Sequence, residues 1–340
     1  MTPVGVDIGG LAETLRTSRS LGGKGDIATV ARRMGLGGGS EVPVGDDCAA
    51  IPSGDGWLLL AIEGFMNEFV AEDPWFAGWC GVMVNLSDIA AMGGRPTAVV
   101  DAVWAPGAAG AAAIVDGLKA ASECYEVPVV GGHTNFTTDR RQLAVAVLGH
   151  ASRLLTSFDA RPGDRLIAAI DLRGRYREPF ANWEAATGAP AQRLRGDLEL
   201  LPLLAERSLS RAAKDISQGG IVGTAAMLAE CSGVGAAIDV TAVPRPAGVP
   251  LARWLQTFPS YGYLIAARPA DVAEVVALFG ARGIAAAEVG AVTAGHTVAI
   301  TAGAATAAVW DLAGTPLLGF GRGPDAGVPA VGNVRNAPHA

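Results

Sequence analysis

Two adjacent carboxylates, Asp46 and Asp47, directly follow Gly45 and stand between apolar segments of the chain. In an extended segment neighbouring side chains point to opposite faces, so one of the two carboxylates would face apolar residues. A desolvated carboxylate is costly unless it is paired with a cation or bound to a metal. An isolated Gly-Asp-Asp is also typical of a solvated turn, so the rest of the chain must distinguish metal binding from a turn.

A second set of oxygen ligands consists of Asn85 and Asp88, which stand three residues apart. On a helix this spacing places both side chains on one face, while Val82, Leu86 and Ile89 form an apolar stripe. An amide oxygen next to a carboxylate suits Mg²⁺, which commonly bridges protein carboxylates and substrate phosphates. The same pair also occurs on ordinary solvated helix faces.

A third candidate is the glycine pair Gly131 and Gly132, which follows a short predicted strand at 127–130 and precedes His133 and Thr134. Paired glycines at the end of a strand allow a ligand to approach the backbone closely and expose amides to an anion. His133 can contact a phosphate or a metal, or act as an acid–base group. A lone histidine after a strand is also an ordinary structural hydrogen-bonding residue.

Two further segments carry features of phosphate binding. Lys24 lies in the stretch Leu21-Gly-Gly-Lys-Gly25, which is more natural in a loop over a ligand than in a packed element. Asp215 precedes Ser217 and two glycines, and such a turn at the start of a helix can cradle a phosphate or a substrate. Helix capping explains Ser217 equally well, and Asp215 is either a further metal ligand or a surface acid.

The elements that must position these residues alternate between strands and helices along the chain. We expect a helix from Leu11 to Arg33 interrupted by the glycines around Lys24, one from Asp73 to Met92, and one from Leu198 to Ala213. Strands are expected at 42–51, 57–62, 98–104, 142–150, 165–170, 236–240 and 263–267. Mixed strands and helices in both halves predict an α/β or α+β architecture.

The length of 340 residues, half of them apolar, favours two domains. The polar stretch after Thr156, with Arg161-Pro-Gly-Asp164, marks the expected boundary. We therefore predict an N-terminal domain at 1–155, with a glycine and lysine arm at about 18–39, and a C-terminal domain at 156–318. The Gly/Pro-rich stretch 319–340 is expected to be a flexible tail.

Charge and composition exclude several classes of function. The net charge is −7 without a basic stripe, which argues against nucleic-acid binding. The most apolar stretch is short and broken by proline and glycine, which argues against a membrane span. The four cysteines are widely separated, and the N-terminus lacks the pattern of a secretory signal. These features predict a cytoplasmic protein.

Taken together, these segments resemble in order and spacing the PurM-like superfamily of aminoimidazole ribonucleotide (AIR) synthetase, selenophosphate synthetase, thiamine monophosphate kinase and HypE. The resemblance covers about residues 20–300 and is strongest at Gly45-Asp-Asp-Cys-Ala-Ala50 and Asn85-Leu-Ser-Asp-Ile-Ala-Ala-Met-Gly93. It implies a two-domain PurM-like fold. In that fold the N-terminal domain forms a shared β-barrel across a homodimer, and the C-terminal domain is an α/β sandwich.

The resemblance also implies ATP in a cleft between the domains and ATP- and Mg²⁺-dependent phosphoryl transfer to a small-molecule acceptor. The metal ligands that it implies are Asp46, Asp47, Glu63, Asp88 and Asp215. The nucleotide contacts that it implies are Gly45, Asp46, Asp47, Asn85, Asp88, Gly131, Gly132, His133 and Thr134. Lys24 and His133 are the expected catalytic residues.

Three departures from the related enzymes leave the acceptor open. No cysteine precedes Lys24, where selenophosphate synthetase carries cysteine or selenocysteine, and Glu63 replaces the common aspartate. His133 and Gln218 stand where kinase-like members have aspartate. Two alternatives to a kinase therefore remain: an AIR-synthetase-like ATP-driven cyclisation or dehydration, and a non-catalytic nucleotide-binding partner protein.

Overall fold

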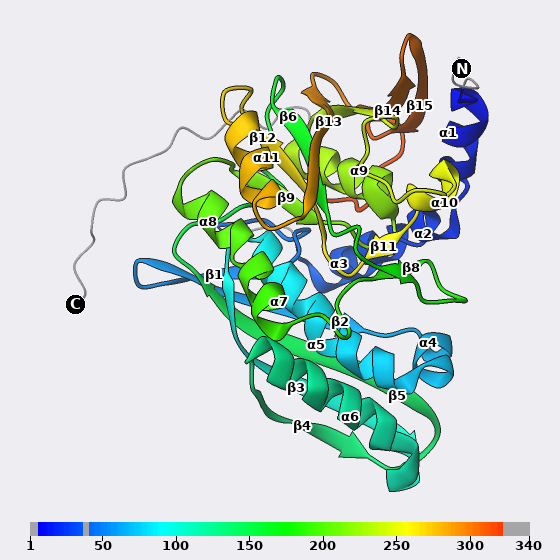
Figure 1. Ribbon diagram of the computed structural model, residues 1–340, viewed down its shortest axis with the longest axis vertical. Helices are drawn as coiled ribbons and strands as arrows, with labels where there is room; N and C mark the ends of the chain where they lie inside the picture. Colours follow the sequence, from blue (N-terminus) through cyan, green and yellow to red (C-terminus); the bar gives the residue numbers. More distant parts are fainter. Residues whose placement is uncertain (1–5, 37–40, 322–340) are drawn as a thin grey trace.

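The computed structural model describes residues 6–36 and 41–321 and arranges them around two large sheets (Figure 1). The first sheet has five strands in the order β1-β2-β5-β3-β4. Their bounds are β1 (Ala49–Ser53), β2 (Gly56–Gly64), β3 (Arg95–Pro106), β4 (Val129–Asn135) and β5 (Thr137–Ala151). Only β3 and β4 run parallel in this sheet, because helix α6 (Gly107–Tyr125) provides the crossover that a parallel pair needs.

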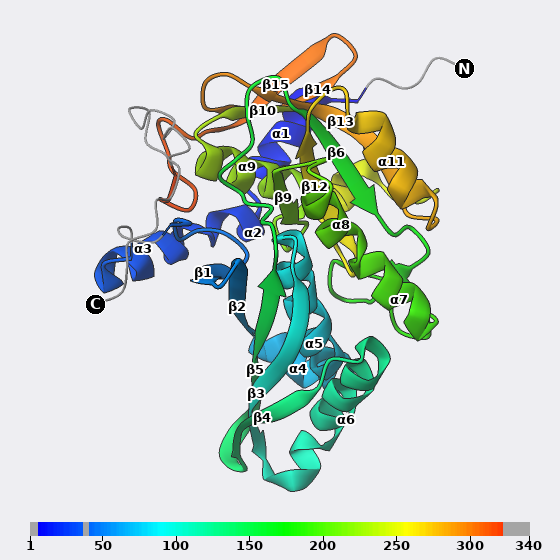
Figure 2. The same cartoon turned by 90° about the vertical axis from the view of Figure 1, so that its left-hand side faces the viewer.

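Helix α5 (Pro74–Ala91) lies with α6 on one side of this sheet, as Figure 2 shows, and the short helix α4 (Asn67–Glu72) precedes it. The Asp73 carboxylate accepts a hydrogen bond from the Phe76 N–H, and Pro74 occupies the first helical position, so the helix begins where the sequence predicts. It ends before Gly93, which has a φ of 76°. Nearly all of α5 is buried, which fixes the Asp88 side chain inside the molecule.

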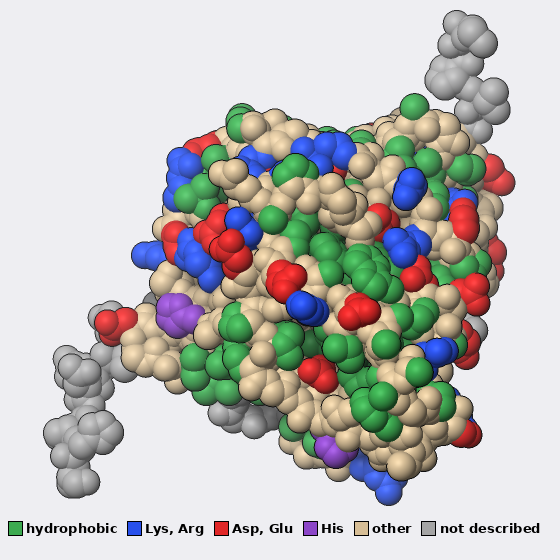
Figure 3. Space-filling view, turned by 60° about the horizontal axis from the view of Figure 1, so that its bottom comes forward, with side chains coloured by type: hydrophobic (Ala, Val, Ile, Leu, Met, Phe, Trp, Pro, Cys, Tyr) green, Lys and Arg blue, Asp and Glu red, His purple; other side chains and the backbone are tan. Residues whose placement is uncertain are grey.

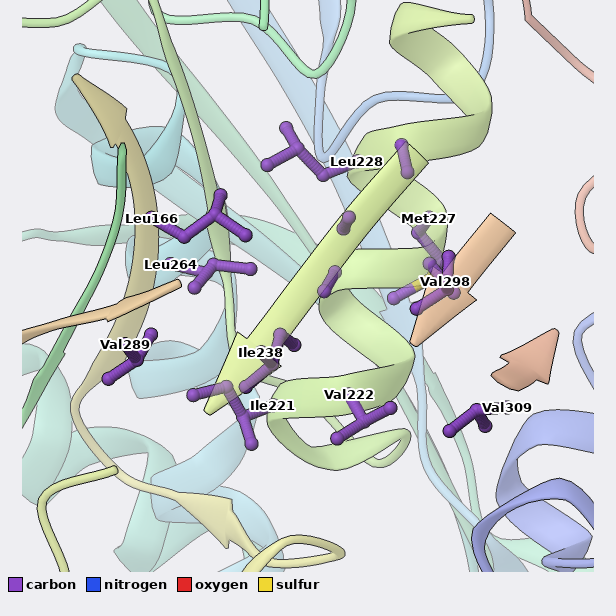
Figure 4. Packing of buried hydrophobic residues seen from close by; sticks show 14 of the residues in the cluster. Leu166, Ile221, Val222, Met227, Leu228, Ile238, Leu264, Val289, Val298 and Val309 are labelled. Atoms are coloured by element: carbon purple, nitrogen blue, oxygen red, sulfur yellow. The ribbon is translucent and has the colours of Figure 1, made fainter. Parts of the chain in front are cut away.

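The second sheet has seven strands in the order β15-β14-β10-β13-β6-β12-β9. Its strands are β6 (Arg165–Ile170), β9 (Ala212–Asp215), β10 (Gly235–Asp239), β12 (Gly262–Ala267), β13 (Ala285–Thr293), β14 (Thr297–Ala302) and β15 (Ala305–Asp311). Helix α9 (Gly220–Ser232) packs on one face, and Figure 4 shows the core between α9 and β10. The opposite face packs against α8 (Leu200–Glu206) and α11 (Val272–Gly280), so this half is an α/β sandwich.

The first helix belongs to the second core and not to the first sheet. Ile8, Leu11 and Leu15 of α1 (Ile8–Arg16) are buried in the core around α9, and the Arg16 guanidinium donates hydrogen bonds to backbone carbonyls of β15. This packing differs from the expected grouping of residues 1–155. Two helices then follow α1 along the arm, α2 (Arg19–Gly22) and α3 (Gly25–Met34), with Lys24 between them.

Two sequence predictions of secondary structure near the site are wrong. The segment 198–213 is not one helix, because α7 (Ala191–Leu198) and α8 end early and the chain then forms β9, which pairs with β12. Asp46 and Asp47 lie in the loop before β1 and not along a strand.

A small third sheet joins β11 (Phe258–Pro259), β8 (Asn182–Glu184) and β7 (Arg175–Tyr176), and α10 (Leu251–Trp254) precedes β11. Within the described ranges, every helix is too short or too polar to cross a membrane.

Candidate functional site

Three carboxylates from three separate elements meet between the two sheets. Asp47 comes from the loop before β1, Asp88 from α5, and Asp215 from the end of β9. One oxygen of each carboxylate lies within 4.8 Å of an oxygen of the other two. The Oδ2 atom of Asp88 is buried and has no hydrogen-bond partner among the residues that the structure describes. A buried, unpartnered carboxylate oxygen facing two others is a set of hard oxygen donors, and this set fits Mg²⁺.

Buried lysine and backbone groups offset part of this negative charge. The Lys214 ammonium forms an ion pair with Asp47, and the Asp215 N–H donates to the Asp47 carboxylate at 3.4 Å. Burial lowers the pKa of Lys214, but attraction by Asp47, Asp46 and Asp215 outweighs burial, so the pKa of Lys214 is raised. Burial, and then repulsion by Asp47, raise the pKa of Asp215 to about 8. Burial also raises the pKa of Asp88 well above its usual range, with a further contribution from Asp215.

Asp46 is anchored differently from its neighbour. Its carboxylate accepts hydrogen bonds from the Ser157 N–H at 2.7 Å and the Ser157 hydroxyl at 2.6 Å. Burial raises the pKa of Asp46 to about 6, against the lowering effect of Lys214. Ser157 lies in the chain that joins the two sheets, so this contact fixes the Gly45–Asp47 loop to the second half of the molecule.

The cluster lines a pocket of ≈ 400 Å³ to which Lys24, Glu63 and Gln218 also contribute. Five carboxylates and two lysines line this acidic pocket, so its charge favours a bound cation. Burial raises the pKa of Glu63, while nearby Lys24 lowers it. Of the twelve predicted site residues, the pocket therefore gathers seven: Lys24, Gly45, Asp46, Asp47, Glu63, Asp88 and Asp215.

Asn85 lies one helical turn before Asp88 but does not line the pocket. Its side chain is fully buried, and its Nδ2 atom donates to the Gly81 carbonyl at 2.8 Å. The Oδ1 atom has no hydrogen-bond partner among the described residues. Asn85 is thus placed behind the carboxylates and not at the surface that a nucleotide would touch.

The structure does not bring Gly131, Gly132, His133 and Thr134 to the acidic pocket. All four are exposed on the edge strand β4, and the His133 ring lies 6.0 Å from the Trp104 ring. The glycines do not end a strand, because β4 continues to Asn135. A Cβ on Gly132 would lie 2.5 Å from the Asp101 carbonyl oxygen, so close strand packing explains this glycine. Within a single chain, these four residues therefore lie outside the acidic pocket that Asp88 lines.

Several residues of the pocket were not predicted from the sequence. Lys214 was not predicted as a site residue although it stands next to Asp215. The helix expected up to Ala213 gave no indication that Lys214 lies on a buried strand. Leu318 and Phe320 line the acidic pocket, and Phe320 packs against Gly45, whose φ is 126°. A Cβ at Gly45 would lie 3.1 Å from the Phe320 Cβ, so the glycine allows this contact. The described part of the expected tail is therefore packed on the site.

Glu230 holds this C-terminal segment in place. Its carboxylate accepts hydrogen bonds from the backbone N–H groups of Leu317 at 3.1 Å, Leu318 at 2.6 Å and Gly319 at 2.9 Å. Three amides directed at one carboxylate position Leu318 and Phe320 over the pocket. The contact links helix α9 of the second core to the wall of the acidic site.

Replacing Glu230 with glutamine is expected to lower the free energy of unfolding by about 2 kcal/mol, since bonds to a charged acceptor are lost and an amide N–H₂ faces backbone donors. Urea unfolding at pH 7 measures this change. Glu123→Gln, at an exposed position on α6, is the matched control and is expected to change stability by less than about 0.5 kcal/mol. Equal stability of both variants would show that Glu230 does not hold the segment.

The fold and the pocket define a two-sheet α/β protein with a buried carboxylate cluster suited to a divalent cation. Residues 45–151 match the N-terminal domain, and residues 182–303 the C-terminal domain, of the AIR synthase related proteins. An uncharacterized protein of Synechocystis sp. is 48% identical over 287 residues, which cover 84% of this chain and 89% of that protein. The chain belongs to the AIR synthase related family, within the PurM-like superfamily that its motifs indicate.

Two other similar proteins have named activities or ligands. A thiamine-monophosphate kinase of Pyrococcus abyssi is 32% identical over 188 residues, which cover 52% of this chain and 59% of the kinase. The solved structure of AaThiL complexed with AMPPCP and TMP superimposes with a TM-score of 0.63 and 23% identity, covering 81% of this chain and 91% of that chain. The latter similarity establishes the two-domain fold.

Proposed function

We propose that this protein binds ATP with Mg²⁺ in the acidic pocket and transfers the γ-phosphoryl group to a small-molecule acceptor. The observation that carries the proposal is the convergence of Asp47, Asp88 and Asp215, whose ligand oxygens lie within 4.8 Å of one another. Asp88 adds a buried oxygen for which the described part of the chain provides no hydrogen-bond partner. A bound Mg²⁺ would neutralise charge on the transferred phosphoryl group. The similarity to thiamine-monophosphate kinase supports this class of reaction.

In this proposal the remaining residues of the pocket bind and position the reactants. Lys24, on the arm between α2 and α3, contacts the phosphates, and Lys214 holds Asp47 in place through their ion pair. An acceptor hydroxyl oxygen forms a bond to the γ-phosphorus, and the bond between that phosphorus and the bridging oxygen of ADP breaks. The hydroxyl proton is released to solvent.

The nucleotide part of the proposal predicts metal-dependent ATP binding. In calorimetry we expect ATP to bind with a Kd of about 1–100 μM in the presence of Mg²⁺, and to bind at least about tenfold more weakly in EDTA, since uncompensated carboxylates repel the phosphates. Absence of binding in Mg²⁺ would contradict the proposal. Phosphate analysis after turnover then separates a kinase from a cyclase, because only the cyclase releases inorganic phosphate beside an unphosphorylated product.

We also infer that a second copy of this chain covers the open face of the first sheet. Leu60 pairs with Leu148, and Ala146 pairs with Val100, so these side chains share one face. The apolar side chains exposed on this face are Ile51, Leu60, Ile62, Val100 and Leu148. On the face of the molecule in Figure 3, hydrophobic side chains likewise reach the surface in patches between charged groups.

An apolar face of this kind is typical of an interface. Residues on the other side of the sheet, such as Leu59, Val99 and Val147, are buried under α5 and α6. His133 pairs with Ala102, which lies on the open face, so His133 would belong to the dimer interface in this proposal.

A further inference from the structure

A second pocket adjoins the acidic one. It has a volume of ≈ 270 Å³. The residues that line both pockets are Glu63, Gly64, Met66, Val84, Gln218 and Phe258. A molecule in the second pocket would therefore reach the carboxylate cluster past Glu63. We call this space the aromatic pocket because four phenylalanines line it: Phe65, Phe69, Phe180 and Phe258.

The described residues that line the aromatic pocket offer no cationic side chain to an anion. Its polar side chains are mainly the neutral amides of Asn182, Gln218 and Gln256, and among the described residues no Lys, Arg or His lines it. Within the described part of the chain, the one acidic side chain that lines this pocket is Glu63. Phosphate esters are usually bound by arginine, lysine or backbone amides, and a carboxylate repels them. Phenylalanine rings with a few amides instead suit a flat, uncharged ring with hydrogen-bonding groups.

The position of the aromatic pocket favours the acceptor over the nucleotide base. The acidic pocket has apolar lining residues of its own, Ile27, Val44, Met227, Leu318 and Phe320, and none of these residues lines the aromatic pocket. A nucleotide base packed against these residues leaves the phosphates at Asp47, Asp88 and Asp215. The aromatic pocket then opens on the carboxylates past Glu63, and an acceptor there lies beside the terminal phosphate. In-line transfer needs attacking and leaving groups on opposite sides of that phosphate.

We propose that the aromatic pocket binds the acceptor, and that this acceptor is an uncharged, ring-containing alcohol and not a phosphate ester. The proposal rests on the proposed phosphoryl-transfer function and adds the chemical class of the substrate. Selectivity arises because four phenylalanine rings bury the acceptor ring and three amides bind its neutral polar groups, whereas the described lining residues include no Lys, Arg or His to bind a phosphate.

The test is ligand-observed NMR on the full chain loaded with AMPPCP and Mg²⁺. The probes are 2-phenylethanol, tryptophol and pyridoxine, each paired with its phosphate monoester. We expect at least one alcohol to bind, and its phosphate ester to bind at least tenfold more weakly. Ala181→Trp fills the pocket and is expected to weaken alcohol binding at least tenfold, with AMPPCP affinity changed less than twofold. Ala304→Trp, at an exposed turn, is the matched control.

Three results would overturn the proposal: no binding by any of the alcohols, equal binding of alcohol and ester, or displacement of the alcohol by adenosine. The last result would assign the aromatic pocket to the nucleotide base. Failure of the phosphoryl-transfer function is recognised separately. In that case AMPPCP does not bind with Mg²⁺, whereas the alcohols still bind to the native chain and not to Ala181→Trp.

Discussion

Asp88→Asn is expected to abolish Mg²⁺-dependent nucleotide binding while the chain still folds. Asp88 supplies a buried oxygen that has no hydrogen-bond partner among residues 6–36 and 41–321, and asparagine replaces this anionic donor by a neutral amide. Loss of even an outer-shell partner of a metal ligand typically costs about 10–100-fold, so loss of a ligand should weaken ATP binding by more than about 100-fold. Calorimetry with ATP and Mg²⁺ measures this effect.

The same variant is expected to be at least as stable as the native chain in EDTA. Burial raises the pKa of Asp88 in the folded chain. Without metal, the Asp88 carboxyl therefore lowers the free energy of unfolding as pH rises above the carboxyl pKa of the unfolded chain. Asparagine removes this cost, and thermal unfolding at pH 8 in EDTA should show an unchanged or higher Tm. Asp116→Asn, at an exposed position on α6, is the matched control for both measurements. Undiminished nucleotide binding by Asp88→Asn would refute the metal assignment.

Ile62→Glu is expected to convert a dimer into a monomer. Ile62 is 70% exposed in the single chain and lies on the open face of the five-stranded sheet with Leu60. In a symmetric dimer each substitution occurs twice, so two glutamates would be desolvated at one apolar interface at a cost of several kcal/mol. Light scattering coupled to size-exclusion chromatography should give twice the chain mass for the native protein and the single chain mass for the variant.

Val115→Glu distinguishes a specific interface from a general effect of surface charge. Val115 is also an exposed apolar residue, at 47%, but it lies on α6 on the opposite side of the sheet. We expect this control to remain dimeric. A native protein that has the mass of one chain, or an Ile62→Glu variant that keeps the native mass, would eliminate the open sheet face as the dimer interface.

The carboxylate cluster was the part of the site that sequence reasoning predicted best. Asp47 and Asp88 stand in motifs whose residue types and spacing suit Mg²⁺, and the structure brings them to Asp215 from a third element. Helix α5 was also predicted closely, because its Asp73-Pro74 start and Gly93 end are local signals. Local signals of this kind depend on a few neighbouring residues and can be read without knowledge of the fold.

Other features depend on contacts between residues far apart in sequence. Lys214 reaches Asp47 only because Ala212–Asp215 pairs with β12, whereas the sequence had suggested a helix that ends at Ala213. Phe320 was expected in a flexible tail at 319–340, since nothing local indicates that Glu230 binds the backbone at 317–319. His133 stands in a glycine motif that looked like a ligand loop, but strand pairing places it on the open edge of the first sheet.

The sequence by itself determined the family, the bounds of helix α5, and the acidic residues that suit a divalent cation. These properties follow from residue types and short sequence spacings, which do not depend on the tertiary structure. Tertiary structure alone decided which acids lie together, which lysine offsets their charge, and that a pocket lined by four phenylalanines lies beside them. Burial and mutual distance set these properties, because both the energy of a charge and the shape of a cavity depend on neighbours that sequence order does not reveal.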